Sequence, residues 1–389
     1  MRDFAVAVAS VGAGYTTMMA SDDGAALIDF GAPSGRDAVR ALERFSDRRH
    51  PLSRHCWPWW HWRPGPEFTE FVVSHPHADH YSGLLRLARM QATTGRQGSL
   101  LQSGGTFFYP MVPRNPDAQR ILYFLARLNE VISSLPENSL GRAVAATSDG
   151  PIRAQPLKRG DTIELAGIKV DVLWPPSLLD ERTTARLRNL VRAYEEIAEQ
   201  AAERGDERLI RAVEALREPT DDLRIADRLY DIPESREQSD LSEIDDDFSD
   251  EGERRRSPLL DDPNFDARLR RLRTSISRGA NLMSLVLATR PQRYVFLGDL
   301  DESLHPEVIG DLVEQDHELL LSAHHGTHFG PDFLRLRSRY IVSSVGPPRL
   351  DRLVRPEYSS IGTHFRTDTA GDVMICMHEA GTHLATCDC

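Results

Sequence analysis

The segment that most constrains this chain is Ser74-His75-Pro76-His77-Ala78-Asp79-His80, which directly follows a short apolar segment that reads as a buried strand. Three imidazoles and a carboxylate within six residues are costly to bury as ordinary packing, because each polar atom then needs a partner. On an extended segment His75 and His77 point to the same side, whereas Asp79 and His80 turn into the helix expected next. This arrangement predicts two pairs of ligands for two adjacent metal positions, and imidazole with carboxylate suits zinc, manganese or iron.

Two more groups of candidate ligands follow apolar segments later in the chain. Asp299 ends one expected strand, and the pair His324 and His325 ends another. Taken alone, Asp299 reads equally well as the cap of the next helix. None of the 14 histidines lies between His80 and residue 305, so a metal site has to assemble from these three strand ends.

The composition of residues 179–278 differs from that of the rest of the 389-residue chain. This block carries 27 acidic and 19 basic residues, reads as charged helices with an acid-rich, disordered stretch at 240–253, and is predicted to be an insertion. We therefore expect one domain formed by residues 1–178 and 279–389. The formal net charge of −12 argues against a protein that coats nucleic acid non-specifically. Most of this charge lies in the insertion, so it says less about which substrates the candidate site could bind.

The sequence gives no sign of a membrane segment. No run of 18 apolar residues occurs, which is the length that a spanning helix needs. The first 20 residues lack the basic start and the unbroken apolar stretch of a signal peptide. These features predict a cytoplasmic protein with no membrane partner.

Further motifs accompany the candidate ligands over residues 1–178 and 279–389. They are Val11-Gly12-Ala13-Gly14, Ile28-Asp29-Phe30-Gly31, Asn281-Leu282-Met283-Ser284-Leu285-Val286-Leu287, Gly298-Asp299-Leu300-Asp301-Glu302, His324-His325-Gly326-Thr327, Ser344-Val345-Gly346 and Arg366-Thr367-Asp368-Thr369-Ala370-Gly371. Together with the H-x-H-x-D-H run, this set resembles the metallo-β-lactamase-fold metallohydrolases and, within them, the metallo-β-lactamase domain of ComEC, a DNA-uptake channel protein.

The resemblance implies an α/β chain folded as a four-layered αββα metallo-β-lactamase sandwich with a large charged, mostly helical insertion. The site would lie at one edge, between the two sheets. It implies two divalent metal ions, zinc or manganese. His75 and His77 would hold one ion, Asp79 and His80 would hold the second, and Asp299 would bridge both.

The same resemblance implies roles for other residues. His324 or His325 would complete the second metal position, and the place of His325 before a glycine favours it slightly. Asp29 would orient the histidine ligands through hydrogen bonds. Thr327 would contact the substrate, and His364 would donate a proton to the leaving group.

The chain departs from the family pattern at three points. His77 occupies a position that is often Asp in ComEC domains, and Tyr15 follows the first glycine turn where an acidic residue is usual. The general family also supplies a ligand histidine from the middle of the chain, and this sequence has none there. We expect water, or a carboxylate such as Asp161 or Asp171, to complete that metal position.

The function implied by the resemblance is a hydrolase that uses a metal-bound hydroxide, above all a phosphodiesterase or nuclease acting on a phosphoester or a short nucleic acid. Two alternatives stay open: a hydrolase of a small ester, such as a phosphocholine ester or a lactone, and a non-catalytic subunit that binds a protein partner through the 179–278 insertion. Before the metal-binding run, a group of aromatic residues either stacks on nucleobases or forms an apolar plug: Trp57, Trp59, Trp60 and Trp62.

Overall fold

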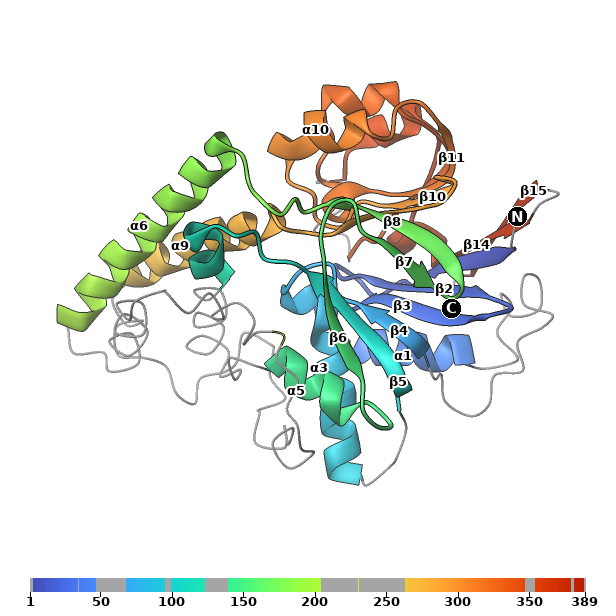
Figure 1. The fold of residues 1–389 in the computed structure, drawn as a ribbon, viewed down its shortest axis with the longest axis horizontal. Helices are drawn as coiled ribbons and strands as arrows, with labels where there is room; N and C mark the ends of the chain where they lie inside the picture. Colours follow the sequence, from blue (N-terminus) through green and yellow to red (C-terminus); the bar gives the residue numbers. More distant parts are fainter. Residues whose placement is uncertain are drawn as a thin grey trace.

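Among the residues that the structure describes, the strands form two sheets that lie face to face (Figure 1). A computed structural model describes residues 3–33, 35–46, 68–94, 99–122, 139–203, 230, 263–346, 354–378 and 381–387. Within these ranges the first sheet has eight strands, in the order β15 (Gly381–Cys387), β14 (Asp372–His378), β1 (Phe4–Val8), β2 (Thr16–Ser21), β3 (Gly24–Phe30), β4 (Phe68–Val72), β5 (Leu101–Pro110) and β6 (Arg153–Leu157). The second has seven, in the order β13 (Thr363–Arg366), β12 (Arg337–Ser343), β11 (Asp316–Leu321), β10 (Tyr294–Phe296), β9 (Val286–Thr289), β8 (Ile168–Trp174) and β7 (Thr162–Leu165).

The alternation of side chains along the strands creates two buried faces on each sheet. On β3, Leu27 belongs to the hydrophobic cluster under the helices, whereas Ile28 belongs to the cluster between the sheets. Leu287 and Leu321 of the second sheet meet Ile28 and Val72 in that middle cluster. The central strands of both sheets are therefore buried on both faces, which requires a covering layer of helices on each outer side.

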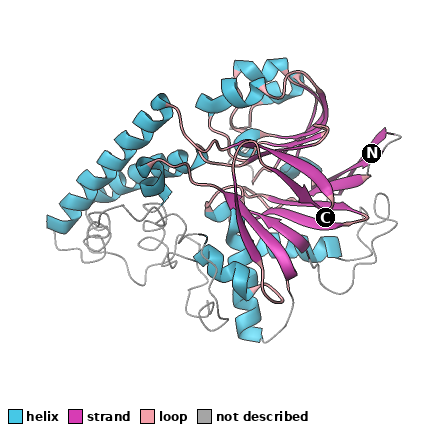
Figure 2. Cartoon of the chain, viewed as in Figure 1, coloured by secondary structure: helices cyan, strands magenta, loops and turns pink. Residues whose placement is uncertain are grey.

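Helices supply the two outer layers (Figure 2). The first sheet is covered by α1 (Arg36–Ser46), α3 (Ala78–Thr94) and α5 (Ser139–Ala146). The second sheet is covered by α6 (Glu181–Glu203), α9 (Pro263–Asn281), α10 (His305–Gly310) and the 3-10 turns η4 (Glu302–Leu304), η6 (Pro331–Arg335) and η8 (Pro356–Ser360). One further short helix, α11 (Thr367–Ala370), joins β13 to β14.

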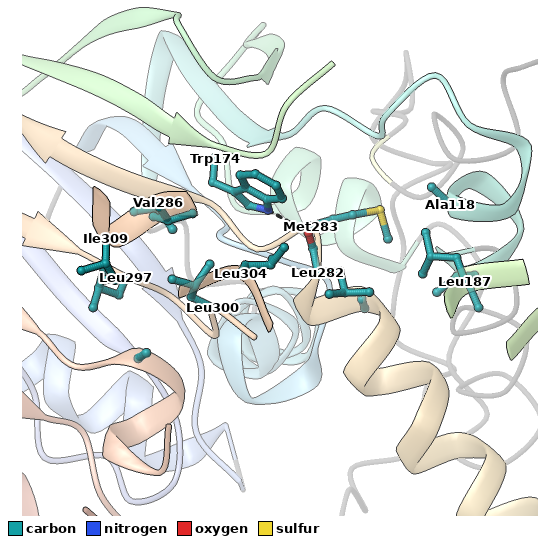
Figure 3. Packing of buried hydrophobic residues seen from close by; sticks show 14 of the residues in the cluster. Ala118, Trp174, Leu187, Leu282, Met283, Val286, Leu297, Leu300, Leu304 and Ile309 are labelled. Carbon is teal, nitrogen blue, oxygen red and sulfur yellow. Dashed lines mark hydrogen bonds between the residues drawn. The ribbon is translucent and has the colours of Figure 1, made fainter. Parts of the chain in front are cut away.

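The helices α6 and α9 come from the predicted insertion and pack against each other. Leu187 and Val191, four residues apart on α6, lie on one helix face and join Ile276 of α9 in the cluster that covers the second sheet. Trp174, at the end of β8, packs into the same cluster and donates its indole N–H to the carbonyl oxygen of Leu282 at 2.7 Å (Figure 3). These helices thus share the core of the domain.

The structure confirms the predicted four-layered αββα architecture. The strand predicted over 282–288 begins only at Val286, because residues 282–283 form a turn after α9. That turn presents the Leu282 carbonyl to Trp174. The helix α9 also continues to Asn281, past the predicted end of the insertion at residue 278.

Two sequence predictions fall on other parts of the chain. The tryptophans at 57, 59, 60 and 62 and the acid-rich stretch at 240–253 lie outside the described residues. Within the described ranges, every helix is too short or too polar to cross a lipid bilayer.

The topology brings the candidate ligands to one edge. β3 and β4 run parallel in the first sheet, and β10 and β11 run parallel in the second. The carboxyl ends of parallel neighbours lie at the same edge of a sheet, which is where open α/β sheets place their binding sites. The two sheets are joined at this edge by a hydrogen bond from the Leu285 amide to the Ser74 carbonyl oxygen at 2.9 Å.

Candidate metal centre

Every segment of the candidate site leaves the carboxyl end of a strand. Asp29 lies near the end of β3, and the loop 74–77 leads from β4 into α3, whose first turn carries Asp79 and His80. Asp299 follows β10, and the 3-10 turn η5 (Ala323–Gly326) follows β11 with His324 and His325. The predicted ligands therefore come from both sheets.

The structure brings six of the seven predicted ligands together in two groups, whereas His324 belongs to neither group. The first group is His75, His77 and Asp299, and the second is Asp79, His80 and His325. Within each group one ligand atom from every residue lies within 4.8 Å of the others. Three nitrogen and oxygen ligands in so small a volume match the number that a catalytic zinc site uses, with a further position left for water or substrate.

Asp299 connects the two groups because its carboxylate oxygens face different histidines. Its Oδ2 lies 3.6 Å from His75 Nε2, and its Oδ1 lies 3.4 Å from His80 Nε2 and 3.9 Å from His325 Nε2. His325 Nε2 is also 3.4 Å from Asp79 Oδ2. One buried carboxylate thus lies between the two groups, which is the place that a bridging ligand would occupy.

Unsatisfied polar atoms gather at this point. Among the described residues, the buried side-chain atoms without a hydrogen-bond partner include His77 Nε2, His80 Nε2, His325 Nε2 and Asp299 Oδ1. A buried polar atom with no partner costs about 1–3 kcal/mol, so four of them in one cluster need a reason. All four are atoms through which imidazole and carboxylate bind metals, so the cluster fits divalent metal ions.

Asp29 fixes the orientation of the loop at residues 74–77 and of His80 through hydrogen bonds. It is fully buried, and its oxygens accept hydrogen bonds from the Ser74 amide, the Ser74 hydroxyl and His80 Nδ1, each at 2.7 Å. Because His80 Nδ1 donates to Asp29, the nitrogen available to a metal ion is Nε2, which faces Asp299. This is the arrangement by which a carboxylate orients a histidine ligand.

The turn η5 is held in a strained conformation. His324 and His325 have positive φ angles of 48° and 56°, which side chains other than glycine rarely adopt. Two buried tyrosines fix this turn: Tyr15 Oη donates to the Ser322 carbonyl oxygen at 2.7 Å and accepts from the His325 amide at 3.2 Å. Tyr358 Oη donates to the His328 carbonyl oxygen at 2.6 Å and accepts from the Ala323 amide. Strain that neighbours enforce in this way is typical of functional sites.

The environment of the cluster favours the charged forms of two residues, the imidazolium of His80 and the carboxylate of Asp299. Burial alone would lower the pKa of His80, but Asp29, Asp299 and Asp79 around it raise that pKa well above its usual range. Burial alone would raise the pKa of Asp299, but the surrounding histidines, His324 first among them, hold it well below its usual range. A metal ion that binds at His80 would therefore compete with a proton for this ring.

Thr327 and His364, two predicted site residues, lie outside both ligand groups. Thr327 directly follows η5, and its hydroxyl donates to the His324 carbonyl oxygen at 2.7 Å. His364 Nε2 lies 2.8 Å from the Ser343 hydroxyl, outside both ligand groups. Burial, with a smaller effect from Arg366, lowers the pKa of His364 to about 4, so this ring is neutral at pH 7.

The two carboxylates considered for the incomplete metal position also lie elsewhere. Asp161 accepts from Lys158 Nζ at 2.8 Å, and Asp171 accepts from Arg290 at 2.7 Å. Both belong to ion pairs around the β7–β8 hairpin and neither joins a ligand group.

Sequence reasoning missed the residues that support the ligands. Ser284 accepts a hydrogen bond from the Asp299 amide at 3.0 Å, and Tyr358 and His328 contact η5 and its flanking residues. Two of these residues could have been found from the sequence. Ser284 lies in the 281–287 motif, and His328 is a further histidine only four residues after His324. Tyr358 left no signal, because only the folded chain brings it to the η5 turn.

No protein-family model matches this sequence, and no curated protein matches it. Solved structures that are similar in fold include the metallo-β-lactamase fold protein YhfI from Bacillus subtilis, at 12% identity over 44% of this chain and 53% of that chain with a TM-score of 0.24. They also include a long-form RNase Z from yeast, at 8% identity over 99% of this chain and 50% of that chain with a TM-score of 0.40. A third is Zn(2+)-bound PqqB from Methylobacterium extorquens, at 15% identity over 44% of this chain and 55% of that chain with a TM-score of 0.24. The matches span about half the length of these proteins.

Proposed function

We propose that this chain is a dinuclear metal-dependent hydrolase that cleaves phosphodiesters, as a phosphodiesterase or nuclease of the ComEC-like group. The observation that carries the proposal is the position of Asp299, whose two oxygens face two different groups of ligands. Two divalent ions, zinc or manganese, would supply an activated water and neutralise negative charge on the substrate oxygens.

The residues of the site are prepared to hold such ions. Burial lowers the pKa of His75 well below its usual range and that of His77 to about 4, so both rings keep a free nitrogen lone pair at neutral pH. His80 differs, because Asp29 and its neighbours favour a proton there until an ion replaces it. Asp299 stays ionised and serves both groups.

A phosphodiester is the substrate class that this arrangement favours. Two adjacent positions that share one carboxylate fit an in-line displacement, in which the attacking and the leaving oxygens both need stabilisation. The motifs shared with the ComEC domain support the same class. Short nucleic acids fit better than long duplex, given the formal net charge of −12.

Metal analysis of the purified protein tests the site. We expect close to two ions per chain, and close to none in Asp299→Ala. Fewer than one ion per wild-type chain after reconstitution with zinc or manganese would count against a dinuclear centre.

Hydrolysis assays test the chemistry. The substrates are labelled single-stranded DNA, duplex DNA, bis-p-nitrophenyl phosphate, a phosphocholine ester and a lactone. Asp79→Ala should lose activity, whereas the matched control Asp311→Ala removes an exposed carboxylate that pairs with Arg159 and should keep it. Equal activity in wild type and Asp79→Ala would refute catalysis at this site. Cleavage of the lactone or the phosphocholine ester alone would move the substrate class to small esters, and no cleavage would favour the non-catalytic alternative.

A further inference from the structure

The first ligand group has only three members, because this chain has no histidine at the mid-chain position from which the metallo-β-lactamase-fold family supplies a further ligand. His75, His77 and Asp299 form this group, and no other histidine precedes residue 305 after His80. We propose that His324 is the missing ligand of the first metal position, and that His328 fixes the tautomer of His324. This inference rests on the proposed function, because it assigns residues to one of its two metal positions.

The adjacent histidines of η5 face different oxygens of Asp299. His324 Nε2 lies 3.5 Å from Asp299 Oδ2, the same oxygen that His75 approaches at 3.6 Å. His325 Nε2 lies instead on the side of Asp299 Oδ1, at 3.9 Å, and of Asp79. The ring centroids of the two histidines are 6.0 Å apart. The pair therefore serves both positions, His324 the first and His325 the second.

The positive φ angles explain how neighbouring residues reach two positions. Consecutive residues of an extended strand point to opposite faces, so only one of two adjacent histidines would face the site. Two successive left-handed residues turn the backbone so that both rings approach Asp299. The strain is stabilised by Tyr15 and Tyr358, which bind the turn from two sides.

A chain of hydrogen bonds decides which nitrogen of His324 is free. His328 Nδ1 lies 3.0 Å from the Leu300 carbonyl oxygen, which only accepts, so His328 Nδ1 must donate. In the neutral ring His328 Nε2 is then an acceptor, and it lies 2.9 Å from His324 Nδ1, which must donate in turn. The hydrogen of His324 is thereby placed on Nδ1, and its Nε2 lone pair faces Asp299.

These hydrogen bonds of His328 also connect the segment that carries Asp299 with the segment that carries His324. Leu300 follows Asp299 directly, so His328 connects the loop of the bridging carboxylate to the turn that carries His324. We therefore assign His328 as a positioning residue, which acts on the metal through His324 and does not contact it.

Single metal positions can be isolated to test the assignment. Asp79→Ala leaves only the first position complete, and His77→Ala leaves only the second. The added change is His324→Asn, because asparagine tolerates positive φ angles. Zinc and cobalt affinities are measured by competition with a chromophoric chelator, and the cobalt visible spectrum reports the ligand set.

The expected result is asymmetric. His324→Asn should weaken metal binding by roughly tenfold or more in the Asp79→Ala background, and change it less than about threefold in the His77→Ala background. The reverse pattern would assign His324 to the second position and overturn the proposal. Unchanged metal affinity in both backgrounds would also overturn the proposal. If the KM of His324→Asn were raised at the same time, His324 would be a substrate contact instead. Wild-type protein that binds no ion would overturn the proposed function itself.

The role of His328 is tested by two substitutions in the Asp79→Ala background. His328→Leu removes the acceptor for His324 Nδ1 and should weaken the first position about 10–100-fold. His328→Gln keeps an acceptor oxygen and should restore part of the affinity. His378→Leu, at an exposed histidine that pairs with Asp3, is the matched control. Equal affinity in His328→Leu and His378→Leu would remove His328 from the site.

Discussion

Asp299 shows how one side chain can determine a whole site. It is almost completely buried, and its two oxygens face histidines that come from two separate segments of the chain, 75–80 and 324–325. A buried carboxylate without paired charges is strongly disfavoured, so this position is stable only with histidines or metal ions around it. The charge of Asp299 thus favours the arrangement of imidazoles that the strand ends bring around it.

The isosteric change Asp299→Asn should therefore affect both metal positions. We expect the affinity of each to fall by at least about tenfold, because the amide provides one neutral oxygen in place of a shared carboxylate. His77→Ala should weaken only the first position. A two-site metal titration of the three proteins checks this, and a loss confined to one position in Asp299→Asn would contradict the bridging role.

His364 gives a prediction about pH. Its pKa of about 4 in the folded protein lies below the value of about 6.5 expected in the unfolded chain, so the unfolded chain binds more protons between these values. The stability that His364 contributes is present above pH 6.5 and is lost as the pH falls toward 4. Denaturant unfolding at pH 7 and pH 5 should show a smaller drop for His364→Gln than for wild type.

Nuclear magnetic resonance can follow the same ring directly. We expect a titration midpoint near pH 4 and an unchanged activity profile between pH 6 and 8 in His364→Gln. A midpoint near neutrality, with an altered profile in the variant, would support the proton-donating role that the sequence resemblance implied.

At the scale of elements, the site depends on how closely α3 approaches β3. A Cβ atom added at Gly31 would collide with the carbonyl oxygen of Asp79, the first-turn residue of α3 that belongs to the second ligand group. The same carbonyl accepts a hydrogen bond from the Tyr15 amide at 3.1 Å. Glycine at position 31 is therefore required for the contact between strand and helix that places Asp79.

Gly31→Ala should consequently destabilise the fold by about 1–3 kcal/mol and weaken the second metal position. Gly310→Ala is the matched control, since a Cβ there meets no atom within 4 Å, and its effect should stay within about 0.5 kcal/mol. Denaturant unfolding and metal titration provide the two measurements. Equal stability of the two variants would show that α3 can shift without cost.

The sequence was informative about elements that carry their own signal. The H-x-H-x-D-H run and the apolar segments before residues 299 and 324 predicted that the candidate ligands follow strands, because hydrophobic runs that end in polar residues mark strand ends. The supporting contacts of Tyr358 and His328 depend on the left-handed conformation of η5, which nothing local predicts. The packing of α6 and α9 into the core was hidden by their many charged residues.

At the scale of the whole molecule, the metal ions would connect the two sheets. Each group combines residues that follow β4 of the first sheet with residues that follow β10 or β11 of the second. Binding at such a place stabilises the native state, because the unfolded chain does not hold these ligands together.

Removal of the metals should therefore lower the melting temperature. At an ion concentration 100 times Kd, each position contributes about 2.7 kcal/mol. Calorimetry of the protein before and after treatment with a chelator, and after addition of zinc, measures this contribution. We expect a loss of several degrees that zinc restores, whereas Asp299→Asn should show a smaller change on both treatments, because its positions bind the ions more weakly. A wild-type melting temperature that ignores the chelator would contradict a metal bridge between the sheets.

The strand order of the first sheet has a consequence for translation. β1 lies between β2 and β14. One edge of this buried strand therefore stays unpaired until β14, which comes late in the sequence, has been synthesised. While the ribosome makes the residues between them, the nascent chain exposes both this open strand edge and the histidine-rich loop before α3. Open edges of this kind favour association between chains. Binding of metal ions at both groups would thus have to follow completion of β11 and its turn. Protection of the β1 edge comes later still, once β14 (Asp372–His378) has emerged.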